Sequence, residues 1–320
     1  MKTLVIVNQS AAKARRVWPS IQKRLDDAGV RFDTHQTKSP RDATSTTRQA
    51  LKNGVNTIAV VGGDGTLSEA AEGFFEFNGN LDLPPVVVNP AASLAILPAG
   101  TGNDFARGFC GHRAVLDEFI DTLVSHCLGT SDRSRLVDVL YGRCDGFEQP
   151  FICLNASTMG IGGETAERVA AQGKLMRNFS GEFRFLSAAV GALAAWRERR
   201  VRVTLDGHMT ADGPMNLVVV SNSLYAGGGM KFSPMANLDD GKLDVLTASG
   251  LARAEVIYEL SRVHKGEHVK NPKVNIIQGE IVKIETLLLQ DAMPLEADGN
   301  VRGVTPVQFR VLPSTLRFVV

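Results

Sequence analysis

The sequence predicts two domains, an α/β N-terminal domain built on a doubly wound, mostly parallel sheet and a second domain that is an antiparallel β-sandwich. Over the first 130 residues, short apolar strand candidates alternate with helix-like segments, which is the pattern of a doubly wound sheet. After about residue 131, strand candidates follow one another closely, as in a sandwich. The length of 320 residues suits two domains of ordinary size.

The strand candidates of the first domain are apolar and β-branched, as parallel strands buried on both faces usually are. They are residues 3–8, 30–37, 56–63 and 93–100. The helices expected between and after them are residues 12–28, 39–54, 66–77, 103–109 and 116–128. The second of these helices has Ser39 as a plausible N-cap, Pro40 as its first residue and Gly54 as its stop.

The second half contains seven further strand candidates, interrupted by helical insertions near residues 181–197 and 252–264. The strands are residues 135–142, 150–157, 199–207, 216–223, 242–249, 273–279 and 280–286. Asp206-Gly207 and Asp212-Gly213 are expected to form turns between strands. The domains are therefore placed at residues 1–130, completed by the C-terminal segment 305–320, and at residues 131–304.

Composition excludes several classes of protein. The net charge of +1 implies no general attraction to nucleic acid, and no nucleic-acid partner is expected. Four cysteines without a CxxC pair or zinc-finger spacing indicate reduced thiols in a cytoplasmic protein. The start of the chain resembles a strand more than a signal peptide, and the longest mainly apolar stretch, 187–196, is shorter than the roughly 20 residues of a spanning helix. Any membrane contact is expected to be peripheral.

The stretch VVGGDGTLSEAAEGF, residues 60–74, places three glycines and one aspartate at a strand-to-helix junction. Glycines permit left-handed backbone angles and close approach of a ligand to the main chain. The N-terminal N–H groups of a following helix favour a phosphate. Asp64 could hold a metal ion, could orient or deprotonate an acceptor hydroxyl, or could simply cap the next helix. The motif is neither a P-loop nor a dinucleotide fingerprint.

A second glycine-rich turn follows the next strand, in ILPAGTGNDFARGF, residues 96–109. Thr101 can donate its hydroxyl to a phosphate, and Asn103 or Asp104 can cap the helix that follows. Two such turns in one parallel sheet share its carboxyl edge, where ligands collect. The pair predicts a nucleotide-phosphate site.

These motifs resemble those of the diacylglycerol kinase catalytic-domain family, which includes bacterial lipid kinases, sphingosine kinases and ceramide kinases. GGDGT is followed by PxGTxNDFAR, and residues 218–246 are similar to the family's GGG turn and DDG-x-LDV strand. Residues 262–274 and the closing segment from residue 296 match as well. Four motifs in the family's order make the resemblance specific.

The resemblance implies a first domain related in shape to phosphofructokinase and NAD kinase, and a protein that binds ATP. It assigns the nucleotide site to residues on four loops: Asn8, Ser10, Thr37, Gly62, Gly63, Asp64, Gly65, Thr66, Leu67, Ser68, Thr101 and Asp104. The first loop reads NQSAAK and lacks the proline and glycine that the family often has there.

The resemblance also implies a structural magnesium site in the Asp239-Asp240-Gly241 turn. The ligands carried over are the side chain of Asp240 and the main-chain carbonyls of Asn237 and Lys242. Magnesium prefers oxygen ligands. Without the resemblance, the same residues would be interpreted as an ordinary turn before a strand.

One departure from the family lies near the end of the chain. Where the family commonly reads DGE, with the glutamate as proton acceptor, this chain reads Asp298-Gly299-Asn300. An amide cannot act as a base near neutral pH. Asp298 is the predicted replacement, with Asp64 as an alternative. Glu296 is a third candidate if the strand bends, because a straight strand would put 296, 298 and 300 on one face.

The sequence therefore predicts an ATP- and magnesium-dependent lipid kinase that phosphorylates a hydroxyl of a diacylglycerol-like lipid. It is expected in the cytoplasm, transiently at the inner face of the membrane, with the lipid as partner and a homodimer left open. Two alternatives remain: a weakly active or non-catalytic nucleotide- or lipid-binding homologue, which Asn300 favours, and a kinase with a soluble acceptor. The acyl chains, headgroup and pathway do not follow from the sequence.

Overall fold

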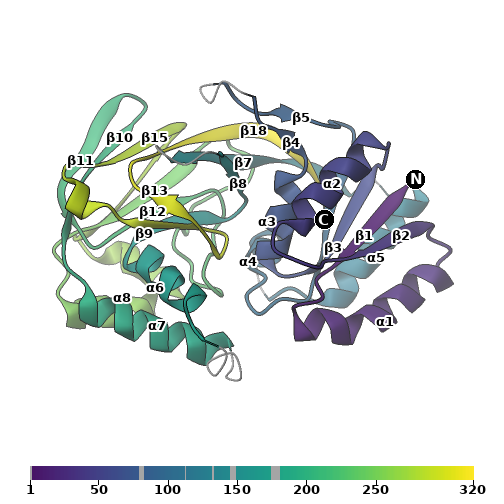
Figure 1. Cartoon of the computed structure of the whole chain (residues 1–320), viewed down its shortest axis with the longest axis horizontal. Helices are drawn as coiled ribbons and strands as arrows, with labels where there is room; N and C mark the ends of the chain where they lie inside the picture. The colour runs from purple at the N-terminus through teal and green to yellow at the C-terminus, as the bar shows by residue number, and fades with distance from the viewer. Residues whose placement is uncertain (1, 79–82, 112, 132, 145–148, 174–180) are drawn as a thin grey trace. The chain divides into compact units, whose positions relative to one another are not determined.

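The computed structural model describes residues 2–78, 83–111, 113–131, 133–144, 149–173 and 181–320. The chain forms two compact units (Figure 1). The first comprises Met1–Val139 with Leu312–Val320, and the second comprises Leu140–Val311. Two strands, β7 (Ser134–Cys144) and β18 (Val307–Val319), each run from one unit into the other.

The first unit is an α/β layer structure whose central strands are parallel. Its sheet has the order β2-β1-β3-β6, with the last part of β18 parallel to β6. Every residue of β1, β3 and β6 is buried, as expected for strands covered on both faces. Helices α1 and α5 pack together on one face, and α2 and α3 pack together on the other (Figure 1). The elements are β1 Thr3–Val7, α1 Ala12–Asp27, β2 Phe32–Gln36, α2 Asp42–Lys52, β3 Thr57–Gly62, α3 Asp64–Glu72, β4 Phe75–Glu76, β5 Val86–Val87, β6 Ser93–Pro98, α4 Asp104–Cys110 and α5 Leu116–Leu128.

Two helices of this unit begin elsewhere than the sequence predicts. Helix α3 begins at Asp64, with Gly63 as its N-cap, so Asp64, Gly65 and Thr66 form its first turn and do not precede it. Helix α2 begins at Asp42 and not at Pro40. The Asp42 carboxylate accepts the N–H of Lys38 at 2.7 Å, which stabilises the preceding residues as a loop.

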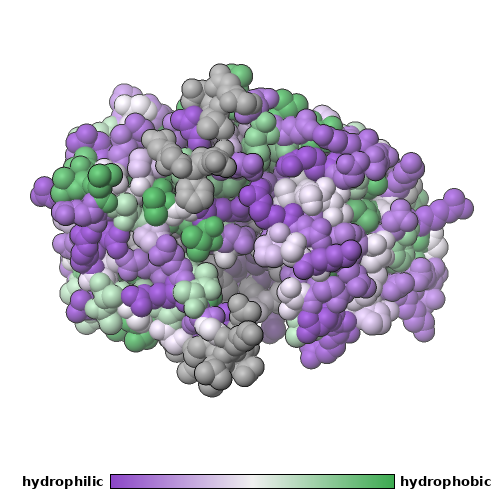
Figure 2. Space-filling view, in the orientation of Figure 1, coloured by the Kyte–Doolittle hydropathy of each residue, from purple (hydrophilic) through white to green (hydrophobic). Residues whose placement is uncertain are grey.

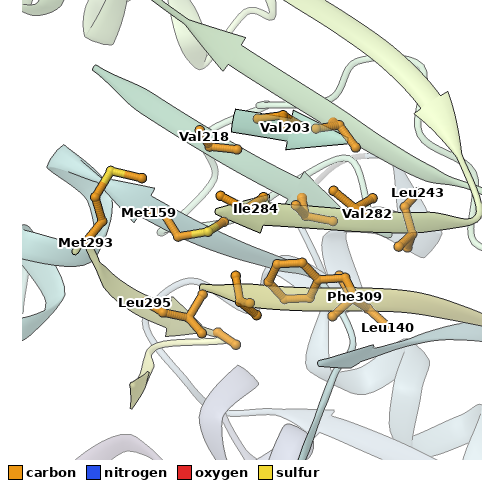
Figure 3. Packing of buried hydrophobic residues seen from close by; sticks show 14 of the residues in the cluster. Leu140, Met159, Val203, Val218, Leu243, Val282, Ile284, Met293, Leu295 and Phe309 are labelled. Carbon is orange, nitrogen blue, oxygen red and sulfur yellow. The ribbon is translucent and has the colours of Figure 1, made fainter. Parts of the chain in front are cut away.

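The second unit is an antiparallel β-sandwich. One sheet has the order β11-β10-β15-β18, and the other has the order β14-β13-β12-β9-β16-β17. Figure 3 shows side chains from the two sheets pointing toward one another, among them Val203, Ile284 and Phe309 opposite Val218 and Leu295, all within one buried cluster. The elements are β8 Phe151–Cys153, β9 Ala156–Gly160, α6 Ile161–Ala170, α7 Gly181–Ala195, β10 Arg199–Leu205, β11 His208–Met215, β12 Leu217–Ser221, β13 Leu243–Ala248, α8 Arg253–Val263, η2 Glu267–Lys270, β14 Val274–Gly279, β15 Ile281–Thr286, η3 Leu289–Asp291, β16 Pro294–Ala297 and β17 Asn300–Val304.

Of the two turns expected in this unit, one is confirmed and one is wrong. Asp206 and Gly207, with φ of 49° and 82°, do form the turn between β10 and β11. Asp212-Gly213, however, lies inside β11, where Asp212 pairs across the ladder with Arg202 at 2.8 Å. Helix α6 was not predicted at all, because its glycines and single charges give only a weak helical pattern. Among the helices in the described ranges, none has the length and apolar character needed to cross a bilayer.

Candidate active site

Four loops of the first unit meet at the carboxyl edge of its parallel sheet. The Asn8 side-chain amide donates to Thr66 Oγ1 at 2.7 Å, which joins the loop after β1 to the first turn of α3. The N–H of Gln9 donates to Thr37 Oγ1 at 3.3 Å, which joins the same loop to the end of β2. Ser10, also predicted for the site, donates its N–H to Asn8 Oδ1 at 2.8 Å. The structure therefore brings the predicted residues of these loops together.

The two glycine-rich turns touch each other main chain to main chain. A Cβ atom built on Gly100 would lie 2.4 Å from the Cα of Gly63, and one built on Gly63 would lie 3.0 Å from the Cα of Gly100. Left-handed angles are not the reason for these glycines, since neither residue has a positive φ. Their small size is needed because the two turns approach so closely.

Asp64 links the same two turns through its carboxylate. Its Oδ2 accepts the N–H of Asp104 at 3.0 Å, and its Oδ1 accepts the N–H of Phe105 at 2.9 Å. These are the first two residues of α4, whose own N-cap residue provides no side-chain cap. Asp64 therefore caps a helix that begins 40 residues later, which is a different helix from the one the sequence suggests.

The second turn is closed by Asn103 and not by its neighbours. Asn103 adopts a left-handed conformation with φ of 51°. Its side chain accepts the N–H of Gly100 at 2.8 Å and donates to the Gly100 carbonyl at 3.2 Å. Thr101 is exposed at the tip, whereas the Asp104 side chain is buried. The sequence predicts Asn103 only as a possible helix cap, although the tolerance of asparagine for left-handed angles is a signal for this role.

The remaining residues assigned to the nucleotide site form the N-terminal turn of α3 and its support. Gly62, Thr66, Leu67 and Ser68 are buried, and Gly65 is partly exposed. Of the whole set, Thr101 and Ser10 are exposed, and Gly63 and Gly65 leave the main chain of this turn partly exposed. The positive end of the α3 dipole lies there too.

In the second unit, Asp298 binds main-chain N–H groups in the same manner as Asp64. Its carboxylate accepts the N–H of Leu154 at 2.7 Å and that of Asn155 at 2.9 Å. Only 6% of the residue is exposed. Both oxygens of the predicted base are therefore occupied in holding the connection between β8 and β9.

The Glu296 carboxyl, close to this turn, has a raised pKa. Burial raises the pKa of its carboxyl to about 7, against the lowering effect of hydrogen bonds from the Gly299 N–H and the Thr158 hydroxyl. Thr158 Oγ1 donates to Glu296 Oε2 at 2.8 Å. A carboxyl with a pKa near neutrality can take up and release protons under physiological conditions.

The chain around Asn300 is a hairpin and not one straight strand. Asp298 and Gly299 have φ of 48° and 82° and form the two-residue turn between β16 and β17. Asn300 pairs with Ala297, whereas Glu296 pairs with Val301. Glu296 and Asn300 therefore project from opposite faces of the hairpin, and the expectation that 296, 298 and 300 share a face is wrong.

The predicted magnesium ligands lie in the turn before β13. Asp240 is exposed, and its Oδ1 accepts the N–H of Lys242 at 3.0 Å, which is the turn geometry expected without a metal. One carboxylate and the carbonyls of Asn237 and Lys242 form a hard-oxygen donor set that fits magnesium. Within the described ranges there is no cluster of three or more His, Cys, Asp or Glu side chains suited to a metal.

Comparison with known proteins gives consistent matches over almost the whole chain. A family model described as the diacylglycerol kinase catalytic domain matches residues 2–136, and one described as the YegS C-terminal NAD kinase beta sandwich-like domain matches residues 158–320. The chain is 26% identical to the diacylglycerol kinase of Staphylococcus carnosus (strain TM300) over 307 residues, which cover 95% of this chain and 90% of that protein. It is 26% identical to the diacylglycerol kinase of Bacillus subtilis (strain 168) over 289 residues, covering 90% of this chain and 86% of the relative. A crystal structure of a diacylglycerol kinase from Bacillus anthracis str. Sterne shares the fold, with a TM-score of 0.68, 22% identity, and coverage of 99% of this chain and 96% of that one.

Proposed function

The chain belongs to the diacylglycerol kinase family, and from that premise we propose that it transfers the γ-phosphate of ATP to a hydroxyl of a diacylglycerol-like lipid. The observation that carries the proposal is the Asp64 carboxylate, which ties the two glycine-rich turns into one rigid unit through the N–H groups of Asp104 and Phe105. Phosphoryl transfer depends mainly on positioning and on charge neutralisation. A rigid pair of turns meets the first requirement.

In the proposed mechanism, the phosphates lie against the N-terminal turn of α3. The main-chain N–H groups there and the positive end of the helix dipole favour the anion, and the exposed Thr101 hydroxyl donates to it. Asp64 acts as a positioning residue, since its oxygens are engaged with α4. Magnesium would be held by the Asp240 side chain with the Asn237 and Lys242 carbonyls, and it would supply positive charge that stabilises this turn.

Two buried or partly buried carboxyls, Asp298 and Glu296, are candidates for the group that accepts the proton of the lipid hydroxyl. Both carboxylates accept two hydrogen bonds, Asp298 from two main-chain N–H groups and Glu296 from the Gly299 N–H and the Thr158 hydroxyl, so hydrogen bonding alone does not separate them. Glu296 has a pKa of about 7, which is the value at which a general base works best near neutral pH. We therefore propose Glu296 over Asp298 as the carboxyl able to take the proton, with Asp298 holding the hairpin in place.

The test of the proposal is to incubate the protein with labelled ATP, magnesium and a bacterial lipid extract and to resolve the products by mass. We expect one new phospholipid whose mass exceeds that of a diacylglycerol by one phosphate. Phosphate transfer to a water-soluble acceptor alone would contradict the lipid assignment. No transfer to any acceptor would contradict kinase activity.

A pair of hydroxyl deletions tests the phosphate site. Thr101→Ala should raise the KM for ATP about tenfold, because a hydrogen bond to a charged group contributes about 1.5–3 kcal/mol. The matched control is Ser20→Ala on α1, whose hydroxyl donates to the Val17 carbonyl within the same helix. Equal effects of the two substitutions would remove Thr101 from the site.

A second candidate function, binding of nucleotide or lipid without turnover, is favoured by one observation. The family carboxylate is replaced by Asn300, and Glu296 projects from the opposite face of the hairpin. Asn300→Glu should raise kcat about 100-fold if the chain is a kinase that lacks this base, since a general base contributes about 10²–10⁴-fold. Tight ATP binding with no transfer before or after the substitution would favour the binding function.

A further inference from the structure

Helix α8 leaves large apolar side chains on its outer side. The exposed fractions are 60% for Ile257, 61% for Tyr258 and 40% for Leu260, whereas Val256 and Val263 are buried on the inner side. Helical spacing places Ile257 and Tyr258 at the centre of the outer face, and Lys265 lies in the turn just past the end of the helix. Surface helices normally present polar side chains there, and exposed apolar patches mark interaction surfaces.

The charges around this face are positive. The Glu255 carboxylate is held by Lys273 Nζ at 2.7 Å, and the Glu259 carboxylate is held by Arg262 at 2.9 Å. Lys265 and Arg253 are exposed. Residues 251–275 contain five Lys and Arg against three Glu, whereas the whole chain carries only +1. The carboxylates of the helix are therefore neutralised while cations border the apolar centre.

The outer face is also fixed in place. Lys231 donates its N–H to the Val263 carbonyl at 3.0 Å, and His264 Nδ1 lies 3.1 Å from the Gly229 carbonyl oxygen. Gly227, Gly228 and Gly229 all have positive φ, a sequence of angles that favours glycine throughout. This GGG turn anchors the C-terminal end of α8, so the helix offers its outer face as a rigid platform.

We propose that the outer face of α8, with Ile257 and Tyr258 at its centre and Lys265 at its border, docks on an anionic lipid surface. The proposal rests on the proposed function, because an enzyme with a membrane lipid as acceptor must meet a bilayer. Interfacial helices combine an apolar face, an amphipathic ring such as that of tyrosine, and basic side chains that reach anionic headgroups. Each of these is present on α8.

The charge pattern disfavours a second copy of the chain as the occupant. A two-fold symmetric interface would place the outer face of α8 against itself. With the two-fold axis near Ile257 and Tyr258, the Lys265 end of one copy would lie near the Arg253 end of the other, and the carboxylates of Glu255 and Glu259 are already paired within each copy. An anionic surface supplies the missing counter-charge.

A second apolar surface of this unit provides a control. It is formed by Leu287, Leu288 and Leu289, and Leu289 is 98% exposed. Figure 2 shows an apolar area at the left edge of the view, where η3 lies in Figure 1. The neighbouring Arg197 is paired with Asp291 at 3.0 Å, whereas Arg200, whose carbonyl accepts the Leu287 N–H at 3.4 Å, is exposed. This surface therefore tests whether vesicle binding depends on the outer face of α8 or on any apolar surface with a basic neighbour.

The experiment measures cosedimentation of the full chain with two kinds of vesicle, pure phosphatidylcholine and phosphatidylcholine with an equal amount of phosphatidylglycerol. The chain should bind the anionic vesicles more tightly. Ile257→Ser combined with Tyr258→Ser should weaken that binding at least about tenfold, from the loss of two buried apolar side chains. Lys265→Glu should weaken binding to the anionic vesicles only. Leu289→Ser, which removes a similar apolar side chain elsewhere, should leave binding unchanged.

Three results would overturn the proposal. The first is loss of binding in Leu289→Ser with binding retained in the α8 variants. The second is equal binding of the unsubstituted chain to both kinds of vesicle. The third is conversion of a dimer to a monomer by the double variant, measured by analytical sedimentation. Circular dichroism serves as the control that each variant is folded. Lys265→Glu tests the same surface without removing an apolar side chain. Because the assay involves no turnover, a chain that binds vesicles but transfers no phosphate would contradict the proposed function alone.

Discussion

Asp64 in the first unit and Asp298 in the second make the same contact in different surroundings. Each carboxylate accepts two successive main-chain N–H groups from a distant segment, Asp104 and Phe105 in one case and Leu154 and Asn155 in the other. Asp64 is partly exposed and caps a helix. Asp298 is buried in a hairpin turn.

The two aspartates differ in which neighbouring groups they leave accessible for binding or proton transfer. In the first unit the carboxylate organises two turns whose main chain is open to an anion. In the second unit the carboxylate organises a hairpin, and burial raises the pKa of the neighbouring Glu296, the group that we propose as proton acceptor, to about 7. An aspartate in a glycine-rich motif can thus be architectural while a neighbouring group is reactive.

The largest expected effect compares the two aspartates directly. Asp298→Ala should lower the free energy of unfolding by about 4 kcal/mol, because it leaves two buried N–H groups without an acceptor at about 1–3 kcal/mol each. Asp64→Ala should cost about 2 kcal/mol, since water can reach the partly exposed N-terminus of α4. Urea unfolding measures both, with the exposed Asp33→Ala as control. A greater loss for Asp64→Ala would reverse the comparison.

The free energy of unfolding should depend on pH because of Glu296 in the second unit. Its folded pKa of about 7 lies above the reference value of 4.5, so the folded state binds more protons than the unfolded state between these values. Stability should therefore fall as pH rises through this window, by about 3 kcal/mol in total.

Glu296→Gln should remove that fall, and Glu280→Gln, an exposed carboxyl on the same unit, should retain it. Urea unfolding at several pH values between about 5 and about 8 measures the slope. If the slope is the same in all three proteins, the titrating group is not Glu296.

The smallest expected effect concerns the contact between the glycine turns. Gly100→Ala should lower stability by about 2 kcal/mol and weaken ATP binding, because the added methyl group would overlap the Gly63 main chain. Gly173→Ala is the matched control, since a Cβ there would have no atom within 4 Å. Calorimetric titration with ATP should separate the two variants. Unchanged binding in Gly100→Ala would mean that the closeness of the turns does not matter for the nucleotide.

Local pattern predicted much of the fold, because strand hydrophobicity and helix spacing are properties of neighbouring residues. Helix 116–128 and the strands around Ile58 and Val245 follow from the sequence alone. The partners of Asp64 and Asp298 do not, because they lie 40 and more than 140 residues away and exist only after folding. The pKa of Glu296 depends on burial, which no local pattern supplies.

The hairpin at residues 298–299 could have been foreseen. The Asp-Gly signal that predicts the turn at Asp206-Gly207 is present at Asp298-Gly299 too, with the same left-handed angles. The opposite error occurs at Asp212-Gly213, which lies inside a strand because Asp212 is paired with Arg202 across the ladder. Dipeptide signals give the right turn only where the cross-strand partners permit it.

The position of strand β18 at the end of the chain affects how the first unit can fold during translation. Its last residues pair in parallel with β6, from Arg317 opposite Ser93 to Val319 opposite Ala95, and they complete the sheet of the first unit. A nascent chain on the ribosome that has emerged only as far as Val139 would leave β6 as a bare sheet edge. The first unit must wait for translation of the second before it can close, so during synthesis this edge is the place where a chaperone would be needed.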